Sequence, residues 1–142
     1  MNIVQLYDFI EELAITKTNV NSYFRGDIYT NWNTKEIKYS SVNAAVETID
    51  EYENYEVYNV ILYYGDRLVE GGDNRWQVQS EAVRILKDII KNIRETYGEV
   101  TFDEITETVT YNLFDQKFAD YLAGAWCRVR IAFPVDVCAD EQ

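Results

Sequence analysis

Apolar and polar residues follow a helical period over residues 80–97. The apolar members of this pattern are Ala82, Val83, Leu86, Ile89, Ile90, Ile93 and Tyr97. They recur every three or four residues, and charged residues fill the opposite side. Ser80 is a favourable N-cap, and Gly98 stands where a left-handed residue closes a helix. The pattern predicts an amphipathic helix whose wide apolar stripe packs on a sheet.

Weaker patterns predict the other elements. Residues 2–15 have a helical apolar face, and alternating or β-branched runs predict strands over 20–25, 37–49, 55–64, 105–114 and 125–133. Residues 28–34 carry Tyr29 and Trp32 among Asn and Thr, which is typical of a loop with exposed aromatic side chains. Residues 115–123 favour one or two helical turns. Residues 75–79 fit either a short extended segment or the first turn of the following helix.

Two predicted strands indicate how the sheet faces are divided. In residues 37–49, Ile37 and Tyr39 fall on one face, whereas Val42, Ala44 and Val46 fall on the other, with a bulge or bend expected near residues 40–41. In residues 125–133 the inward set is Ala125, Cys127, Val129, Ile131 and Phe133. The outward set is Trp126, Arg128 and Arg130, and Pro134 ends the strand.

The resulting order is α-β-β-β-α-β-β. Adjacent strands mostly form hairpins, so the sequence predicts an α+β fold with a mixed or antiparallel sheet and helices packed mainly on one face. The 142 residues contain no linker, repeat or low-complexity segment, and we expect one domain over residues 1–142. Residues 136–142 are expected to form a loose acidic tail.

Composition narrows the function. The hydrophobic fraction of 47% and the aromatic fraction of 15% predict an ordered chain despite its charge. The formal net charge of −12 would repel a phosphate backbone, so we expect no direct DNA binding. The chain has neither an apolar run long enough to span a bilayer nor a signal-peptide pattern, and we expect a soluble intracellular setting without membrane attachment.

The chain lacks the residues on which the usual catalytic mechanisms depend. The chain contains no His, and neither a nucleophile motif nor a Gly-rich phosphate loop is present. Cys127 and Cys138 are too far apart for a CxxC site, and we expect both thiols to be reduced, with Cys127 in the core. We therefore predict a protein that is not an enzyme and has no metal or cofactor site.

The candidate functional residues belong to the surface. Arg67, beside Asp66 at the end of a strand, would be able to pair across a subunit boundary, although a solvated strand end explains the same residues. Trp126, Arg128 and Arg130 share one face of the last strand, and Trp and Arg are favoured at interface centres. The alternative is that the second long helix covers this face. We favour the interface, because charge beneath a helix is costly.

Several stretches together resemble a known group of proteins. The leading helix is followed by VNSYFRGDIY, VILYYGDRL, QSEAVRILKDIIKNI and AGAWCRVRI. This pattern, which spans the chain from the first helix to Pro134, resembles the tail-terminator and neck (head–tail connector) ring proteins of tailed bacteriophages. The resemblance implies a non-enzymatic virion subunit, assembled in the host cytoplasm, that forms a six- or twelve-fold ring around the DNA channel and contacts neighbouring portal, neck or tail proteins.

The resemblance brings no catalytic residues with it. It implies subunit contacts at edge strands and in the loops 28–36 and 66–74, and Tyr29, Trp32, Trp126 and Arg128 are residue types that such contacts use. Carboxylates lining the channel would let DNA pass without specific binding. Two alternatives remain: an acidic phage-encoded DNA mimic that binds a basic host protein, and an α+β small-molecule binding module with an apolar pocket beneath the second long helix.

Overall fold

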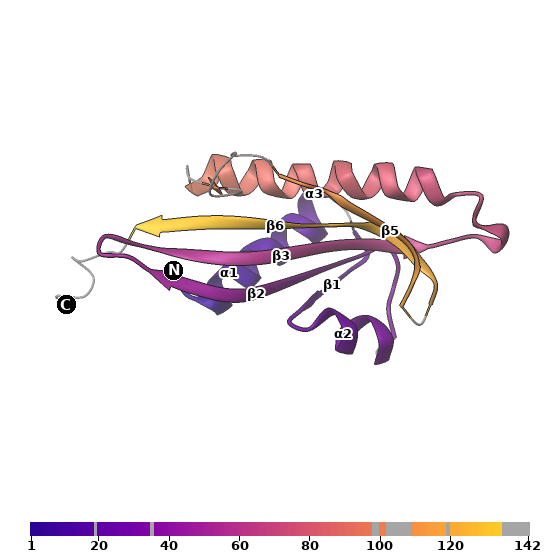
Figure 1. Cartoon of the computed structure of the whole chain (residues 1–142), viewed down its shortest axis with the longest axis horizontal. Coiled ribbons are helices and arrows are strands. Elements are labelled where there is room, and N and C mark those ends of the chain that lie inside the picture. Colours follow the sequence, from indigo (N-terminus) through magenta and orange to yellow (C-terminus); the bar gives the residue numbers. More distant parts are fainter. Residues whose placement is uncertain (19, 35, 98–99, 102–108, 119, 135–142) are drawn as a thin grey trace.

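The computed structural model describes residues 1–18, 20–34, 36–97, 100–101, 109–118 and 120–134, and this part of the chain contains one mixed six-stranded sheet (Figure 1). The strand order is β1-β2-β3-β6-β4, and β5 pairs with another part of β6. The helical elements are α1 (Ile3–Glu12), the π-helical turn η1 (Leu13–Lys17), α2 (Ile28–Thr34), the 3-10 turn η2 (Glu70–Gly72) and α3 (Arg75–Tyr97). The strands are β1 (Ser22–Arg25), β2 (Ser41–Glu51), β3 (Tyr55–Arg67), β4 (Val100–Thr101), β5 (Asn112–Lys117) and β6 (Leu122–Pro134).

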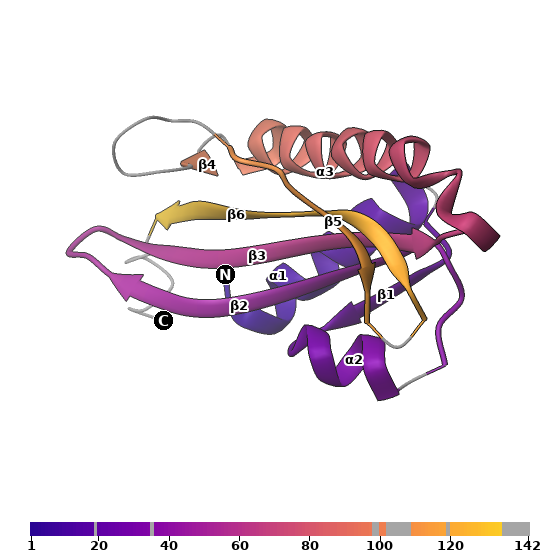
Figure 2. The same ribbon diagram turned by 45° about the vertical axis from the view of Figure 1, so that its right-hand side comes forward.

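The helices lie on both faces of the sheet. α1 and α3 share the main core with inward side chains of β2, β3 and β6, and Figure 1 shows α1 behind the strands. α2 belongs to a second, smaller cluster on the other face, together with side chains of β5 and β6 (Figure 2). The predicted α+β fold with a mixed sheet is confirmed, and its two long helices lie on one face.

β3 is the central strand. It pairs antiparallel with β6 along its whole length, from Tyr55 opposite Pro134 to Arg67 opposite Leu122, and antiparallel with β2 on its other side. β1 runs parallel to the first residues of β2. Since neighbouring residues on a strand point to opposite faces, this register fixes which side chains of β3 and β6 meet each core.

The apolar stripe of α3 fills the space above the sheet. Ala82, Leu86, Ile89 and Ile93 are fully buried, as the sequence pattern predicts. The helix begins earlier than expected, at Arg75, so Ser80 is an interior residue and its predicted N-cap role is wrong. Val78 explains the extra turn, because it is buried four residues before Ala82 and extends the stripe. Residues 75–79 are therefore helical, whereas Gly98 lies outside the described residues.

Tyrosine hydroxyls hold α1 against the sheet. The Tyr7 hydroxyl accepts a hydrogen bond of 2.8 Å from the Val46 N–H, and the Tyr23 hydroxyl donates to the Tyr7 carbonyl at 3.0 Å. The Tyr58 hydroxyl donates to the Met1 carbonyl at 3.1 Å. Since α1 also buries Leu6 and Ile10, the predicted N-terminal helix is confirmed, and it is part of the core.

The loop predicted over residues 28–34 is wrong. These residues form α2, because the Asp27 carboxylate accepts hydrogen bonds from the Thr30 N–H at 2.9 Å and the Thr30 hydroxyl at 2.7 Å. The same two hydrogen bonds lower the pKa of Asp27. Tyr29 is 57% exposed, as expected, but Trp32 is only 1% exposed, so the expectation of an exposed Trp32 is wrong.

The helical turns predicted over residues 115–123 are also wrong. β5 continues to Lys117, a tight turn follows, and β6 begins at Leu122. Gln116, Phe118 and Tyr121 have positive φ values of 50°, 67° and 54°, so a left-handed turn reverses the chain without glycine. Of the strand predicted over residues 105–114, residues 105–108 lie outside the described residues, and the visible strand begins only at Asn112.

The predicted faces of the second strand are confirmed, although its start is wrong. Val42, Ala44 and Val46 contact the main core, whereas Ile37 and Tyr39 contact the α2 cluster. β2 itself begins at Ser41, directly after a bend at Tyr39 and Ser40 that agrees with the bulge or bend expected near residues 40–41, and a separate register shift lies between Val46 and Thr48. The predicted acidic tail, residues 136–142, lies outside the described residues.

Two glycines let the strands and α2 approach closely, and they give a test of the packing. A Cβ at position 124 would lie 1.8 Å from the Tyr64 carbonyl oxygen, whereas a Cβ at position 65 would lie 2.7 Å from the Trp32 ring. We expect Gly124→Ala to lower the unfolding free energy by about 3 kcal/mol or more and Gly65→Ala by about 1–3 kcal/mol, because a side chain moves more readily than a central backbone. Urea denaturation measures both.

Adding Trp32→Phe should reduce the loss of unfolding free energy caused by Gly65→Ala and leave the loss caused by Gly124→Ala unchanged. The reason is that the methyl group added at position 65 lies against the Trp32 ring, whereas the one added at position 124 lies against the Tyr64 carbonyl. Equal losses for the two glycine variants, or relief of both by Trp32→Phe, would contradict the described packing.

Because the Cys127 thiol is buried, we expect the unfolding free energy to fall at alkaline pH. Burial raises its pKa from 9.0 to about 12. Because the unfolded thiol then loses its proton first, stability is full below about pH 9 and falls as the pH rises toward 12, by up to about 1.4 kcal/mol per pH unit from this group. Urea denaturation in reducing buffer between pH 8 and 11 should show a shallower loss for Cys127→Ala than for the Cys138→Ala control. If the unfolding free energies of the two variants fell with pH at the same rate, the Cys127 thiol would not be shielded from solvent in the folded protein.

Candidate functional site

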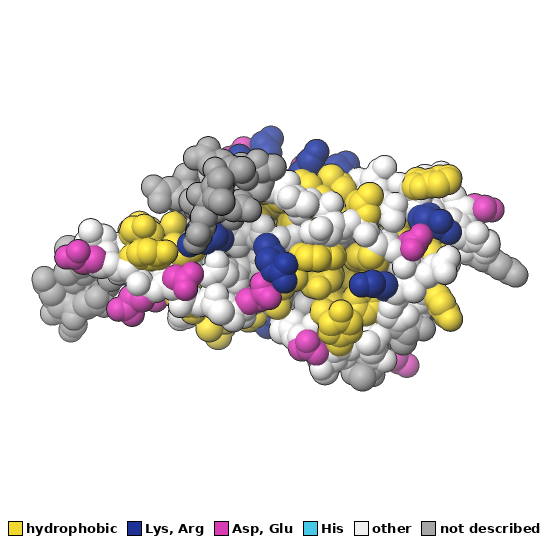
Figure 3. All heavy atoms as spheres, viewed as in Figure 1, with side chains coloured by type: hydrophobic (Ala, Val, Ile, Leu, Met, Phe, Trp, Pro, Cys, Tyr) yellow, Lys and Arg dark blue, Asp and Glu magenta, His cyan; other side chains and the backbone are white. Residues whose placement is uncertain are grey.

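A group of aromatic side chains lies on the sheet face opposite α1 and α3. We call it the aromatic patch, and its members are Tyr29 from α2, Tyr63 from β3, Phe118 from the turn after β5 and Trp126 from β6. Tyr63 and Trp126 are directly opposite in the β3–β6 register, and their rings stack at 5.9 Å and 28°. Tyr29 and Phe118 meet at 5.7 Å. Figure 3 shows hydrophobic side chains gathered over the region where β3, β5 and β6 meet.

Trp32 forms the floor beneath this patch. Its ring lies edge-on to Phe118 at 5.2 Å and to Tyr63 at 6.0 Å, and it packs with buried Phe114 and Leu122. Edge-to-face pairs of this kind are favourable beyond the area that they bury. Trp32 therefore positions the exposed rings and is not itself a contact residue of the surface.

Arg128 borders the patch with a charge. Its guanidinium lies 4.9 Å from the Trp126 ring centroid, and its Nε forms an ion pair of 3.0 Å with the Glu47 carboxylate. An exposed pair of this kind adds little to stability in water. Held over an indole ring, however, the guanidinium remains able to bind a carboxylate or carbonyl of a partner.

The outward row of β6 becomes polar beyond Arg128. The Arg130 Nε donates a hydrogen bond of 3.2 Å to the Asn59 side-chain oxygen, and the Asn59 amide in turn donates to Thr48 and Asp50 at 2.9 Å and 2.8 Å. Arg130 thus shares a face with Trp126 and Arg128. It belongs to a polar network at the other end of that face.

Asp66 and Arg67 lie apart from the patch, at the end of β3. The Asp66 carboxylate accepts a hydrogen bond of 2.8 Å from the Arg67 N–H, and burial raises the Asp66 pKa. The Arg67 guanidinium lies 4.9 Å from the Tyr39 ring centroid, beside a pocket that Lys38 and Asp120 also line. The two residues make local contacts within the chain, and a pairing across a subunit boundary stays a prediction.

The structure thus brings three predicted residues, Tyr29, Trp126 and Arg128, to one surface. α3 packs on the opposite face, so the alternative that the second long helix covers Trp126 is wrong. Sequence reasoning missed Tyr63 and Phe118. The β3–β6 register, had it been known, would have identified Tyr63 as the partner of Trp126. Phe118 was missed because the spacing of residues 115–123 predicted a helix, whereas Phe118 lies in a turn.

The patch is suited to protein contact. Rigid aromatic rings with an Arg at the border are typical of interface centres. The described residues hold no cluster of three or more Cys, Asp or Glu side chains arranged to bind a metal ion. Among the helices described, none is long and apolar enough to cross a membrane.

Comparison with known proteins does not assign this chain to a family. No protein-family model matches the chain, and no curated protein is significantly similar to it in sequence.

Truncating Trp32, which is buried beneath the aromatic patch, and truncating Tyr29, which is exposed within it, should change the unfolding free energy by different amounts. We expect Trp32→Ala to lower the unfolding free energy by about 3–5 kcal/mol, because a buried ring is lost. Tyr29→Ala should change it by no more than about 1 kcal/mol, because most of that side chain is in water. Urea denaturation at low protein concentration compares the two variants. A large loss for Tyr29→Ala would place Tyr29 in the core and remove it from the surface.

Proposed function

We propose that this chain is a non-enzymatic structural subunit of a tailed-bacteriophage virion. In this proposal it forms a cyclic homo-oligomer, six- or twelve-fold, at the head–tail junction, as a tail-terminator or neck protein around the DNA channel. Its other partners are the neighbouring portal, neck or tail proteins, and its location is the virion. DNA passes through the channel without specific binding.

The observation that carries the proposal is the aromatic patch. Tyr29, Tyr63, Phe118 and Trp126 hold a partly exposed aromatic surface on a rigid sheet, and Arg128 lies at its border. Contiguous apolar surface rimmed by charge typically marks a protein contact. A ring subunit requires such a surface, because each copy has to bury part of itself against the next.

The sequence resemblance gives the proposal its specific form. The stretch VILYYGDRL forms the second half of β3 together with Leu68, the residue after it, and AGAWCRVRI forms most of β6. These two strands carry Tyr63, Trp126 and Arg128. The resembling segments therefore supply most of the candidate interface.

The two alternatives gain less support. A DNA mimic presents carboxylates across one exposed face, whereas the exposed side of α3 carries Arg84, Lys87, Lys91 and Arg94. A small-molecule module requires a pocket beneath α3, where buried Leu86, Ile89 and Ile93 instead pack on the sheet.

Assembly of the purified protein tests the proposal. We expect native mass spectrometry to find a cyclic oligomer, and we expect electron microscopy of virions to place it between head and tail. Trp126→Ala combined with Arg128→Ala should weaken assembly by about 2 kcal/mol or more, roughly thirtyfold in dissociation constant, because interface centres lose this much on truncation. The circular dichroism of the monomer should not change.

Val4→Ala is the matched control, since Val4 is an exposed apolar residue of α1, on the other face of the sheet. It should assemble as the wild type does. A strictly monomeric wild-type protein that is absent from particles would refute the ring function. Unfolding of the Trp126/Arg128 variant would instead show that these side chains belong to the core.

A further inference from the structure

Two exposed features lie outside the aromatic patch. The first is the β2–β3 hairpin, which projects past the helices at one end of the molecule (Figures 1 and 2). The second is the exposed side of α3, whose first turn lies toward the other end (Figure 1). Their chemistry is complementary, and this complementarity carries the inference.

The hairpin end is acidic and aromatic. No Lys or Arg occurs between Tyr39 and Asp66, whereas Glu51, Glu53 and Glu56 surround the turn. In the described part of the chain none of these three carboxylates forms an ion pair. The exposed Tyr52 and Tyr55 rings stack at 4.8 Å and 13°, and the Tyr52 N–H donates to the Tyr55 carbonyl at 2.8 Å. The turn therefore presents a preformed aromatic pair among unpaired carboxylates.

The first half of α3 borders an apolar groove. Trp76, which is 73% exposed, and Leu113 of β5, which is 57% exposed, line it together with Gln79, Ser80 and Val83. Its volume is about 350 Å³. Exposed Trp and Leu side chains around a groove form a surface on which aromatic rings of a partner are able to pack.

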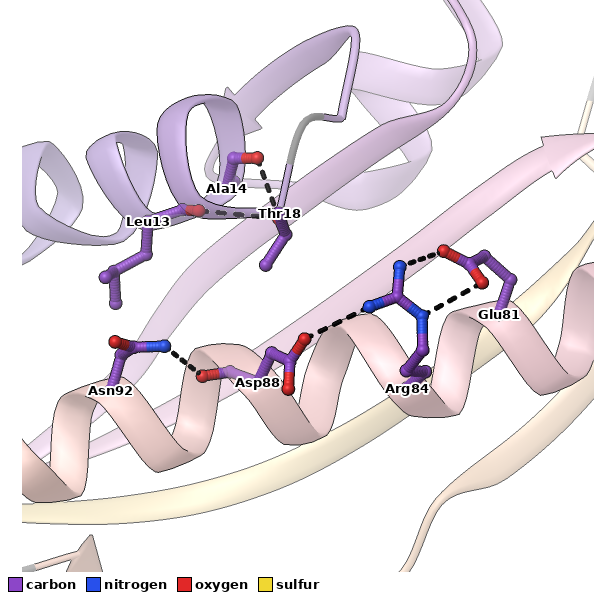
Figure 4. Close-up of polar contacts among 7 residues, drawn as sticks. All are labelled: Leu13, Ala14, Thr18, Glu81, Arg84, Asp88 and Asn92. Carbon is purple, nitrogen blue, oxygen red and sulfur yellow. Dashed lines mark hydrogen bonds and ion pairs between the residues drawn. The ribbon is translucent and has the colours of Figure 1, made fainter.

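Cations run along α3 beside this groove. Arg84, Lys87, Lys91 and Arg94 are all exposed and spaced by three or four residues, so they form one ridge. The Lys87 ammonium lies 5.8 Å from the ring centroid of Tyr111, the residue just before β5. Glu81 and Asp88 lie on the other flank, where Figure 4 shows both bound to Arg84 on the side next to η1, and Glu95 pairs with the Lys91 ammonium at 4.0 Å. The cations therefore lie beside the groove, and Glu81 and Asp88 do not line it.

We propose that the β2–β3 hairpin of one copy docks in the groove between α3 and β5 of the next copy. Tyr52 and Tyr55 pack against Trp76 and Leu113, and the hairpin carboxylates face the cationic ridge at Lys87 and Lys91, two ridge cations that form no ion pair with Glu81 or Asp88 in the described part of the chain. This inference rests on the proposed ring function and adds a second contact between neighbouring copies to the one proposed for the aromatic patch.

A second copy fits the groove better than nucleic acid does. The ridge is narrow, with a carboxylate row on one side and apolar side chains on the other, whereas a nucleic-acid strand calls for a broad positive surface. The hairpin carries aromatic rings that are able to pack in the apolar groove and carboxylates that are able to pair with the cationic ridge. Because the two features lie toward opposite ends of one chain, their contact is head-to-tail, which is the type that generates rings.

Charge exchange tests the contact in the full-length protein. Glu51→Lys with Glu53→Lys, and separately Lys87→Glu with Lys91→Glu, should each raise the dissociation constant of the assembly at least tenfold, because like charges then meet. Carrying all four substitutions in one chain should restore assembly to within about threefold of the wild type. The control is Glu11→Lys with Glu12→Lys, which reverses as many exposed charges on α1, costs only the exposed Arg25–Glu11 ion pair and should assemble normally.

Cross-linking gives an independent readout. In a Cys138→Ser background, protein with Tyr52→Cys mixed with protein with Trp76→Cys should form a disulfide-linked pair on mild oxidation, whereas either protein alone should form far less. Native Cys127 is buried and does not interfere. Sedimentation of the mixture should show the cross-linked species within the assembly.

The outcomes separate this contact from the ring function. If the wild type assembles, but the charge variants assemble equally well and the cysteine mixture stays uncross-linked, the hairpin contact is wrong and the ring stands. If the wild type is monomeric and absent from virions, both proposals fail. Binding of duplex DNA that is lost in the Lys87/Lys91 variant would assign the ridge to nucleic acid and overturn the docking proposal.

Discussion

The pairing of β3 with β6 is the constraint on which the rest of the structure depends. The two strands pair along their whole length, and Gly124 allows the backbones to approach where any Cβ would strike the Tyr64 carbonyl. This single register divides the side chains of β3 and β6 between the two faces of the sheet. Leu62 and Cys127 meet α3 on one face, and Tyr63 and Trp126 stack on the other. The core and the candidate interface are thus two consequences of one set of backbone hydrogen bonds.

Parts of the fold that follow from periodicity could be predicted from sequence. The stripe of α3, the alternation in β6 and the division of β2 between two faces were all evident, because burial imposes a period of 3.6 or 2 on the chain. α2 was missed because seven residues carry little periodicity, and its start depends on one Asp27 cap. The turn at Phe118 was missed because residues other than glycine adopt positive φ there, which tertiary packing imposes.

The candidate site was accessible from sequence only in part. Trp126 and Arg128 were found because alternation along one strand identifies outward residues. Tyr63 required the cross-strand register, and the burial of Trp32 required the position of α2, neither of which a single strand pattern contains. The groove beside Trp76 joins α3 to β5, two elements separated by residues with no recognisable motif. Surfaces that combine distant elements therefore remain hidden until the chain is folded.

The distribution of charge is compatible with the self-association proposed for this acidic chain. A net charge of −12 spread evenly would make copies repel one another. Here the turn of the hairpin carries Glu51, Glu53 and Glu56, none of which forms an ion pair within the described part of the chain, whereas Lys87 and Lys91 lie on the exposed side of α3. Separation of this kind favours head-to-tail contact over contact between like surfaces, because only the first brings opposite charges together. Since the aromatic pair of the hairpin and the groove beside α3 are both formed within one copy, the proposed association would require little ordering of either surface.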